Sequence, residues 1–483
     1  MGKGQTDKIR KTKIICTLGP ATNDYEKVLS LVQAGMNGAR FNFSHGTHEE
    51  HLALMDLVKK AAKETGTPIA LILDTKGPEI RTGTFEGGSA MLTEGSPFTL
   101  RTYESVGDSS GCSVSYSEIA GDVVPGSVVL IDDGLVGLTV TDIKDDEVLC
   151  RVDNGGVVSD HKSINLPGTH VNLPSLTEQD KKDILFGIEQ DIDYIAASFT
   201  RSGSDVAILR ELLDHNAGGE VKIISKIENS EGLENIDSII AGSDAIMLAR
   251  GDLGVEIPPE DVPPIQKRII AKCTAEGKPI ITATQLLDSM MRNPRPTRAE
   301  VADIANAVYD GTDCLMLSGE TAAGSYPEES IEMMSRVAIA TEDSIDYSRL
   351  SRAKKNSTDD SITNAIALAV IKASEATEIK AILAPTSSGY TARIVSLLRP
   401  DTPVIGFATT SKVTKRMALY WGVEPYQSEY ESNITEFYRT ILDTAEENGK
   451  ISKGDTVIMI AGLPIGIGGT TNVMRIHKVG ESL

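Results

Sequence analysis

The stretch KIISKIENSEGLENIDSIIAGSDAIMLARGDLG, residues 222–254, carries the clearest fold signal in the sequence. It contains two short apolar runs, Lys222–Ile227 and Ala245–Leu248, which are separated by a segment with a helical pattern. Apolar strands that alternate with helices indicate a parallel sheet whose strands are joined by helical crossovers. The stretch therefore predicts two consecutive βα units.

Six more apolar runs of the same kind lie on either side of this stretch. They are Ile14–Thr17, Gly38–Phe43, Ile69–Asp74, Tyr194–Ser198, Pro279–Thr284 and Cys314–Leu317. Together with the first two runs they make eight βα units, which is the number that closes a (β/α)₈ TIM barrel. The sequence therefore predicts an α/β fold with a catalytic barrel domain formed by residues 1–75 and 174–345.

The regular spacing of the strands breaks once, between Asp74 and Pro174. About a hundred residues there carry short alternating strands and turn pairs such as Pro125-Gly126 and Asp133-Gly134. This pattern predicts an inserted all-β domain, a small β-barrel over residues 76–173. Because it follows the third strand, it would emerge at the end of the barrel where active sites form, and we expect it to act as a lid.

A second α/β pattern follows the barrel. After the polar link Ser348–Asp360, apolar runs reappear at Lys380–Ala384, Pro403–Phe407 and Thr456–Ala461, with helical patterns between them. Residues 346–483 are therefore predicted to form a C-terminal α/β domain with a parallel sheet, and we expect a regulatory role for it.

Composition excludes several classes of protein. The net charge of −22 disfavours nucleic acid as a partner, because nucleic-acid phosphates need a basic face. No apolar run approaches the ~20 residues that span a bilayer, and the N-terminus has no secretory pattern, so we expect no membrane association. The five cysteines are scattered without a CxxC pair, which indicates a reducing compartment and a cytoplasmic protein.

Polar side chains gather where the predicted barrel strands end. The second strand ends in Arg40, Asn42 and Ser44, which period-two alternation places on one face. A polar layer inside the barrel would explain them, but burying an arginine without an anion is costly. The pattern therefore favours a phosphate or carboxylate site.

Carboxylates follow the fifth and sixth strands. Lys226 and Glu228 lie two residues apart and share a face, while Asp252 follows the next strand beside glycines that let a ligand approach the backbone. Magnesium takes one or two carboxylates from a protein and completes its shell with water and substrate oxygens. The sequence therefore predicts a magnesium site at Glu228 and Asp252.

The seventh strand ends in Thr282-Ala283-Thr284-Gln285, which predicts hydroxyl groups at the same rim, although a simple helix cap explains this string equally well. The sequence contains neither GxxxxGK[ST] nor GxGxxG, so a P-loop or Rossmann cradle is not expected. A nucleotide would then lie between the barrel and the lid.

Seven strings at these strand ends resemble the pyruvate kinase family, and they occur in the order typical of that family. The resemblance extends from about Lys13 to the end of the chain. The strings are RFNFSHG, LDTKGPEIRTG, ISKIEN, MLARGDLGVE, TATQLLDSM, PRPTRAE and DGTDCLMLSGETAAGSYP.

The resemblance implies phosphoryl transfer from phosphoenolpyruvate to ADP, which gives pyruvate and ATP in the last step of glycolysis. It also implies Mg²⁺ or Mn²⁺ and K⁺ as cofactors. The residues implied as catalytic are Arg40, Lys226 and Thr284, and those implied to bind substrate are Arg40, Lys226, Gly251, Asp252 and Thr284. The nucleotide contacts implied are Asn42, Phe43, Ser44, His45, Arg81 and Lys162, with Glu228 and Asp252 on magnesium and Asn42, Ser44, Asp74 and Thr75 on potassium.

Three further expectations follow from the resemblance. A glutamate in the TKGPE string goes with potassium dependence in this family, so Glu79 predicts a potassium requirement. The loop with Thr386, Ser387, Ser388, Gly389 and Thr391, together with a second loop at Gly466–Thr471, matches the pocket for a sugar-phosphate or nucleotide effector. A homotetramer is also implied.

Some alternatives stay open at this point. The proton donor to the enolate is either Thr284 or a water near Ser318 and Glu320. A magnesium-dependent barrel lyase or aldolase that acts on a pyruvate enolate is the nearest rival activity. A catalytically silent homologue that only binds an effector is a second rival.

Overall fold

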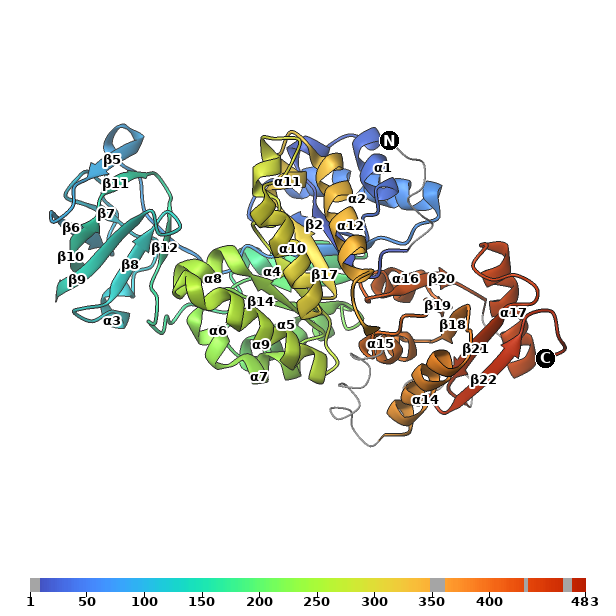
Figure 1. Cartoon of the computed structure of the whole chain (residues 1–483). Coiled ribbons are helices and arrows are strands. Elements are labelled where there is room, and N and C mark those ends of the chain that lie inside the picture. Colours follow the sequence, from blue (N-terminus) through green and yellow to red (C-terminus); the bar gives the residue numbers. More distant parts are fainter. Residues whose placement is uncertain (1–8, 348–360, 430–432, 464–470) are drawn as a thin grey trace.

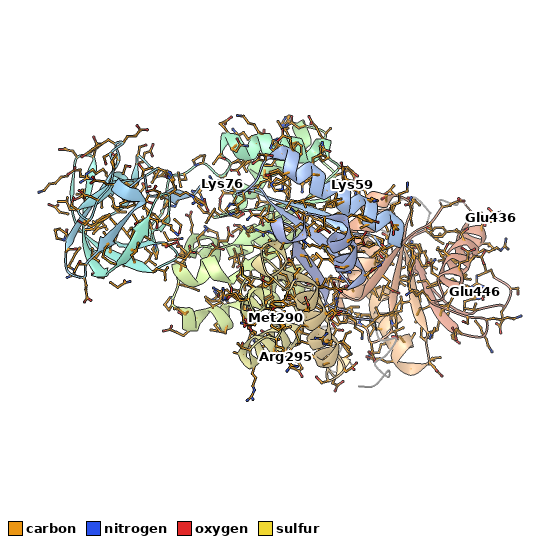
Figure 2. All side chains as sticks on the ribbon, turned by 90° about the horizontal axis from the view of Figure 1, so that it is seen from above. Lys59, Lys76, Met290, Arg295, Glu436 and Glu446 are labelled. Atoms are coloured by element: carbon orange, nitrogen blue, oxygen red, sulfur yellow. The ribbon has the colours of Figure 1, made fainter. Side chains whose placement is uncertain are left out.

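The computed structural model describes residues 9–347, 361–429, 433–463 and 471–483, and it contains three domains in a row (Figure 1). The lid lies at one end, the barrel in the middle and the C-terminal α/β domain at the other end. Seen from above, Lys76 lies where the chain passes from the barrel into the lid (Figure 2). None of the helices in the described ranges is both long and apolar enough to cross a bilayer.

The predicted barrel is confirmed as a closed, parallel, eight-stranded barrel. Its strands are β1 (Lys13–Thr17), β2 (Gly38–Asn42), β3 (Ala70–Asp74), β13 (Tyr194–Ala197), β14 (Lys222–Ile227), β15 (Ala245–Ala249), β16 (Ile280–Ala283) and β17 (Cys314–Leu317). β13 pairs directly with β3, so the insertion between them leaves the strand order of the barrel unchanged.

Helices surround the barrel and bury their apolar faces against the outside of the strands. They are α1 (Tyr25–Gln33), α2 (His48–Thr65), α4 (Glu178–Glu189), α5 (Gly203–His215), α6 (Ser230–Glu234), α7 (Ile236–Gly242), α8 (Arg250–Glu256), α9 (Val262–Ala275), α10 (Arg298–Asp310), α11 (Gly319–Ala322) and α12 (Pro327–Glu342). Short 3₁₀ turns of the barrel domain occupy Pro20–Thr22, Pro259–Asp261 and Asp288–Met291, and another in the lid occupies Glu86–Gly88.

Local sequence signals set the ends of these helices. At the start of α2, the Thr47 side chain accepts a hydrogen bond from the Glu50 N–H and the Glu50 carboxylate accepts one from the Thr47 N–H. The helix ends at Gly66, whose φ of 66° suits glycine. The loop between β2 and α2, which carries Ser44, therefore ends at a defined residue, Thr47.

The lid is a curled seven-stranded sheet with a two-stranded companion. Its elements are β4 (Ile80–Arg81), β5 (Ser89–Leu92), β6 (Pro97–Arg101), β7 (Gly111–Ser113), α3 (Ile119–Asp122), β8 (Val128–Ile131), β9 (Val136–Lys144), β10 (Glu147–Asn154), β11 (Gly156–Ser159) and β12 (Ser163–Asn165). A separate apolar core fills it.

The C-terminal domain is a five-stranded sheet with helices on both faces. Its elements are α14 (Ile362–Ala376), β18 (Ala381–Pro385), α15 (Tyr390–Leu397), β19 (Val404–Ala408), α16 (Ser411–Met417), β20 (Val423–Gln427), α17 (Ile434–Glu447), β21 (Thr456–Ala461) and β22 (Val473–Lys478). Four strands are parallel as predicted, but the edge strand β22 runs antiparallel to β21.

The C-terminal domain docks on the floor of the barrel, which is the end opposite the lid (Figure 1). Buried or partly buried ion pairs join the two domains. Arg399 pairs with Asp313 at 2.8 Å, and Lys415 of α16 pairs with Asp193 at 3.2 Å. Because both acids lie at the amino ends of barrel strands, the docking surface is the floor itself.

Candidate active site

Two buried cations share one carboxylate at the carboxyl ends of the barrel strands. The Arg40 Nε donates to Asp74 Oδ2 at 2.6 Å, and the Lys226 Nζ donates to Asp74 Oδ1 at 3.1 Å. Arg40 and Lys226 are each 8% exposed, while Asp74 is fully buried. These three side chains, called the triad below, come from β2, β3 and β14 and place two positive charges at one spot.

A second carboxylate and a hydroxyl complete the environment of Lys226. Its Nζ contacts Glu228 Oε1 at 2.8 Å and donates to Ser198 Oγ at 2.7 Å. The other oxygen of Glu228 accepts a hydrogen bond from the Phe199 N–H at 2.7 Å. Lys226 is therefore held from three sides, and its ammonium group has little freedom to move.

The charges in this cluster stabilise one another. Burial alone would raise the pKa of Asp74, but Arg40 and Lys226 outweigh burial and hold that pKa below its ordinary value. Burial would lower the pKa of Lys226, but Asp74 and Glu228 raise it above its ordinary value. Lys226 is therefore charged at neutral pH and able to attract an anion.

Glu228 and Asp252 are two acids whose pKa values are both raised. Burial raises the pKa of Glu228 to about 7, an effect that Lys226 reduces and Asp252 increases. Burial also raises the pKa of Asp252. The buried Glu228 carboxylate and the Asp252 carboxylate that lines the neighbouring cavity fit a divalent cation with oxygen ligands, because such a cation favours the ionised form of both acids.

Among the residues that the structure describes, metal-ligating side chains do not form a larger cluster. No group of three or more His, Cys, Asp or Glu side chains that could hold a metal occurs among the described residues. A site with two protein carboxylates, which leaves other positions to water and substrate, is the arrangement that Mg²⁺ commonly takes.

Thr284 lies at the same rim in a strained backbone conformation. Its φ is +68°, a region that β-branched residues rarely adopt, and its Oγ1 accepts a hydrogen bond from the Gly251 N–H at 2.7 Å. The Arg250 guanidinium holds this turn by donating to the Thr284 carbonyl at 2.9 Å. The prediction that Thr282 also reaches the rim is wrong, because its hydroxyl donates to Thr312 Oγ1 inside the protein.

The oxygen donors implied for potassium lie close in sequence and register. Asn42 and Asp74 are partners on the paired strands β2 and β3, and Thr75 follows at once. Ser44 lies beyond the end of β2, where its N–H donates to Asn42 Oδ1 at 3.2 Å. The strand is therefore one residue shorter than predicted, and a turn rather than strand alternation places Ser44.

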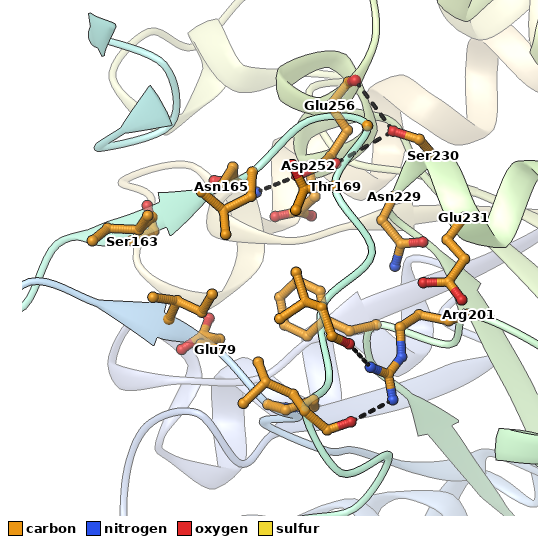
Figure 3. A pocket seen from close by; sticks show the side chains of 18 of the residues that line it. Glu79, Ser163, Asn165, Thr169, Arg201, Asn229, Ser230, Glu231, Asp252 and Glu256 are labelled. Atoms are coloured by element: carbon orange, nitrogen blue, oxygen red, sulfur yellow. Dashed lines mark hydrogen bonds between the residues drawn. The ribbon is translucent and has the colours of Figure 1, made fainter. Parts of the chain in front are cut away.

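A cavity of about 520 Å³ lies between the lid and the barrel (Figure 3). Arg81 and Lys162 of the lid line it together with Asp252 of the barrel, and so does Glu79. Asn42, Phe43, Ser44 and His45 are not among its lining residues. The structure thus brings two of the residues predicted to contact nucleotide to this cavity and leaves the other four outside it.

Direct contacts fix the lid over this cavity. The Asn165 Nδ2 donates to Glu256 Oε1 of α8 at 2.9 Å (Figure 3). The Arg201 guanidinium donates to the carbonyls of Val171 and Leu173, each at 2.7 Å. These contacts fasten both the lid and the segment that leads from it back to the barrel.

Two family models match the chain and together cover most of it. "Pyruvate kinase, barrel domain" matches residues 9–331, and "Pyruvate kinase, alpha/beta domain" matches residues 364–477. The chain belongs to the pyruvate kinase family. It is therefore a phosphotransferase, and the resemblance at the strand ends is confirmed.

Relatives support this assignment over nearly the full length. A pyruvate kinase of Clostridium acetobutylicum is 48% identical over 472 residues, which cover 98% of this chain and 100% of the relative. A pyruvate kinase of Sporosarcina psychrophila is 47% identical over 477 residues, which cover 98% of this chain and 81% of the relative. The crystal structure of a pyruvate kinase from Cryptosporidium parvum superposes with a TM-score of 0.93 at 41% identity, covering 97% of this chain and 96% of that chain.

In the C-terminal domain, the candidate effector loop precedes α15. The Thr386 Oγ1 accepts a hydrogen bond from the Gly389 N–H at 3.0 Å, and Gly389 has a φ of +86°. The Thr391 Oγ1 lies 2.8 Å from the Thr471 Oγ1. The rest of the second predicted loop, residues 466–470, lies outside the described residues.

Sequence reasoning missed two hydroxyls of the pyruvate kinase site. Ser198 contacts both Lys226 and Asp74, and Thr17 accepts a hydrogen bond from the Arg40 Nη1 at 2.9 Å. Both residues end predicted strands. Arg40 and Glu228 were identified because polar residues at the carboxyl ends of barrel strands face the active site. The same reasoning applied to the first and fourth strands would have identified Thr17 and Ser198.

Proposed function

We propose that this pyruvate kinase family member transfers the phosphoryl group of phosphoenolpyruvate to ADP, giving pyruvate and ATP, and that it requires magnesium and potassium. The observation that carries the proposal is the triad, where Arg40 and Lys226 converge on the fully buried Asp74. Phosphoryl transfer leaves a protein mainly the tasks of positioning and of neutralising charge. Two fixed cations in a buried site perform both tasks.

The chain's own residues divide the work by their charge. Lys226 and Arg40 attract the phosphoryl oxygens, and Thr284 orients the reacting carbon end of the substrate beside Gly251. Glu228 and Asp252 would hold the divalent cation, which supplies charge neutralisation when bound. Asn42, Ser44, Asp74 and Thr75 offer the oxygen atoms for the monovalent cation.

The nucleotide would occupy the cavity between lid and barrel. Arg81 and Lys162 face that cavity and supply positive charge for a diphosphate, while the lid keeps water away from the transfer. The Arg81 Nε donates a hydrogen bond to Glu79 Oε2 at 2.8 Å. The carboxylate of Glu79 therefore offsets one cation, which supports a requirement for an added monovalent cation.

The proposal extends to the organisation of the whole protein. Residues 1–75 and 174–345 form the catalytic unit, residues 76–173 the lid, and residues 346–483 the regulatory unit. The loop with Thr386, Ser387, Ser388, Gly389 and Thr391 binds a phosphorylated effector. The assembly is a cytoplasmic homotetramer.

The test is pyruvate formation from phosphoenolpyruvate and ADP with magnesium in potassium buffer. A parallel assay uses tetramethylammonium as the only monovalent cation, and a third assay omits ADP. We expect turnover only when ADP and potassium are both present. Turnover without ADP would contradict the proposal and indicate a lyase, and equal turnover in both buffers would remove the potassium requirement.

A further inference from the structure

The cluster of buried apolar residues inside the barrel includes a side chain that does not come from the barrel. Leu419, two residues beyond α16 of the C-terminal domain, is 3% exposed. It packs in one cluster with inward-facing residues of the strands, among them Ile15, Ile72 and Met316. The C-terminal domain therefore inserts Leu419 into the barrel floor.

Two small residues make room for this side chain. Gly38 and Ala70 face each other on β2 and β3 near the floor. A methyl group placed on Gly38 would lie only 3.1 Å from Leu419 Cδ2, and 3.3 Å from Ile72 Cδ1. Leu419 thus occupies the space that a larger residue at position 38 would fill.

The backbone around Leu419 is held by three barrel strands. The Cys314 Sγ donates to the Leu419 carbonyl at 3.3 Å, and the Lys13 Nζ donates to the Val423 carbonyl at 2.6 Å. The Tyr194 hydroxyl donates to the Arg416 carbonyl at 3.0 Å. Leu419 is therefore fixed relative to the barrel on both sides of its own position.

Two residues of the triad lie further along the strands whose residues surround Leu419. Arg40 follows Gly38 by two residues on β2, and Asp74 follows Ile72 by two residues on β3, so each pair faces inward on the same strand. Two residues of a strand rise by about 7 Å. Arg40 and Asp74 are therefore about one such step along their strands from the residues that surround Leu419.

We propose that Leu419 is a positioning residue for the triad and that the C-terminal domain acts on the active site through it. This inference rests on the proposed role of the triad in binding the phosphoryl group. Gly389 of the candidate effector loop supports it, because a methyl group there would lie 3.3 Å from the Tyr420 ring and 3.5 Å from Met417 Cγ. The segment that carries Leu419 therefore touches the loop at one end and the barrel interior at the other.

The decisive variant is Leu419→Ala, and its matched control is Leu383→Ala. Leu383 is fully buried in the core of the C-terminal domain near α17, away from the barrel. We expect kcat/KM for phosphoenolpyruvate to fall at least tenfold in Leu419→Ala, with the KM for ADP changed less than twofold. Leu383→Ala should stay within twofold of the wild type when both are assayed well below their unfolding temperatures.

A conservative and a compensating variant separate positioning from general stability. Leu419→Met keeps the volume and should restore kcat/KM to within threefold of the wild type. Gly38→Ala should impair the enzyme by crowding Leu419, and Gly38→Ala combined with Leu419→Val should be more active than Gly38→Ala alone. Equal losses in Leu419→Ala and Leu383→Ala, or no relief in the double variant, would overturn the inference.

Crystal structures of the two alanine variants provide a readout that does not depend on activity. The Arg40 Nε to Asp74 Oδ2 distance, 2.6 Å here, should lengthen in Leu419→Ala and stay unchanged in Leu383→Ala. If the wild type showed no turnover, the proposed function would fail while this distance still decided the role of Leu419. An unchanged distance in Leu419→Ala would overturn the inference even in a fully active enzyme.

Discussion

Lys226 contacts three other side chains of the site. Its Nζ lies within 3.1 Å of oxygen atoms of Asp74, Ser198 and Glu228, and the side chain is buried. Its charge is needed for two tasks, because it attracts the transferred group and also balances two buried carboxylates. Removing it therefore changes both the chemistry and the local electrostatics.

We expect Lys226→Met to lower kcat by at least about 100-fold, since the loss of one preorganised donor commonly has that effect. Steady-state kinetics measure the loss, and circular dichroism checks that the variant is folded. The matched control is Lys222→Met, which removes a lysine from the start of the same strand, where it pairs with Asp244 at 3.0 Å. A control that lost as much activity as Lys226→Met would show that the strand, rather than the site, had been damaged.

Glu79 provides a second test at the scale of one residue. In Glu79→Lys the new ammonium group supplies the charge that a monovalent cation would bring, so activity should persist in tetramethylammonium buffer. The wild type should lose most of its activity there and recover it on titration with potassium chloride. Identical potassium titrations for the two proteins would contradict the role assigned to Glu79.

At the scale of elements, α16 joins the barrel floor through charges whose balance depends on pH. Burial raises the pKa of Asp193 to about 6 from an ordinary value of 3.8, although Lys415 partly opposes this. Asp191 differs, because Lys412 and Lys415 overcome its burial and lower its pKa. Ionisation of Asp193 therefore destabilises the folded protein, whereas ionisation of the neighbouring Asp191 stabilises it.

Asp193 should make the folded protein less stable as the pH rises from about 4 to 6. Between these values the unfolded chain loses the proton while the folded chain keeps it, so ionisation favours unfolding; above about 6 the penalty is constant. Asp193→Asn should therefore gain up to ~3 kcal/mol over the wild type across this range. Urea unfolding at a series of pH values measures the difference.

Asp191→Asn is the control with the opposite sign. The lowered pKa of Asp191 stabilises the folded state above its ordinary pKa, and this stability is lost as the pH falls. The variant should be less stable than the wild type at neutral pH, with a smaller effect because Asp191 is largely exposed. The same sign for both variants would contradict this account of the interface.

The elements themselves could largely be predicted from the sequence. All eight barrel strands lie where short apolar runs stand, because a strand buried on both faces must be apolar over most of its length. The alternation of side chains along a strand was enough to predict that Arg40, Lys226 and Glu228 lie at the active site. The error at Thr282 has the same origin, since alternation places a residue on a face but cannot show which partner its hydroxyl finds.

Other features depend on contacts that no local pattern carries. The antiparallel direction of β22 arises from its pairing with β21, and the sequence of one strand does not encode the direction of its neighbour. The bridging role of Ser198 requires Lys226 and Asp74 to meet from different strands. Leu419 reads as an ordinary core residue of its own domain, and only the docking of two domains shows that it completes the barrel.

At the scale of the whole molecule, a contiguous set of contacts connects the candidate effector loop with the triad. Gly389 packs near Tyr420, and the next residue back along the chain is Leu419 in the barrel floor. A ligand that moved the loop would change the position of this segment, and coupling free energies between two sites are typically 1–3 kcal/mol. The C-terminal domain and the active site would thus be coupled without sharing a ligand.

We expect a ligand from a panel of sugar phosphates and AMP to change the KM for phosphoenolpyruvate several-fold in the wild type. In Leu419→Ala the same ligand should still bind, as measured by calorimetry, but should shift the KM by less than twofold. Leu383→Ala serves again as the control and should respond like the wild type. A full response in Leu419→Ala would place the coupling elsewhere in the molecule.

The insertion of Leu419 also has a consequence for the folding of the protein during its synthesis on the ribosome. The last barrel strand, β17, ends at Leu317, so about a hundred residues are added before Leu419 is made. At translation rates of about 5–20 residues per second, this takes on the order of 5–20 seconds. During that interval the floor of the nascent barrel is an exposed apolar surface, which is the kind of surface that chaperones bind. A chain truncated ahead of its C-terminal domain would expose that surface permanently.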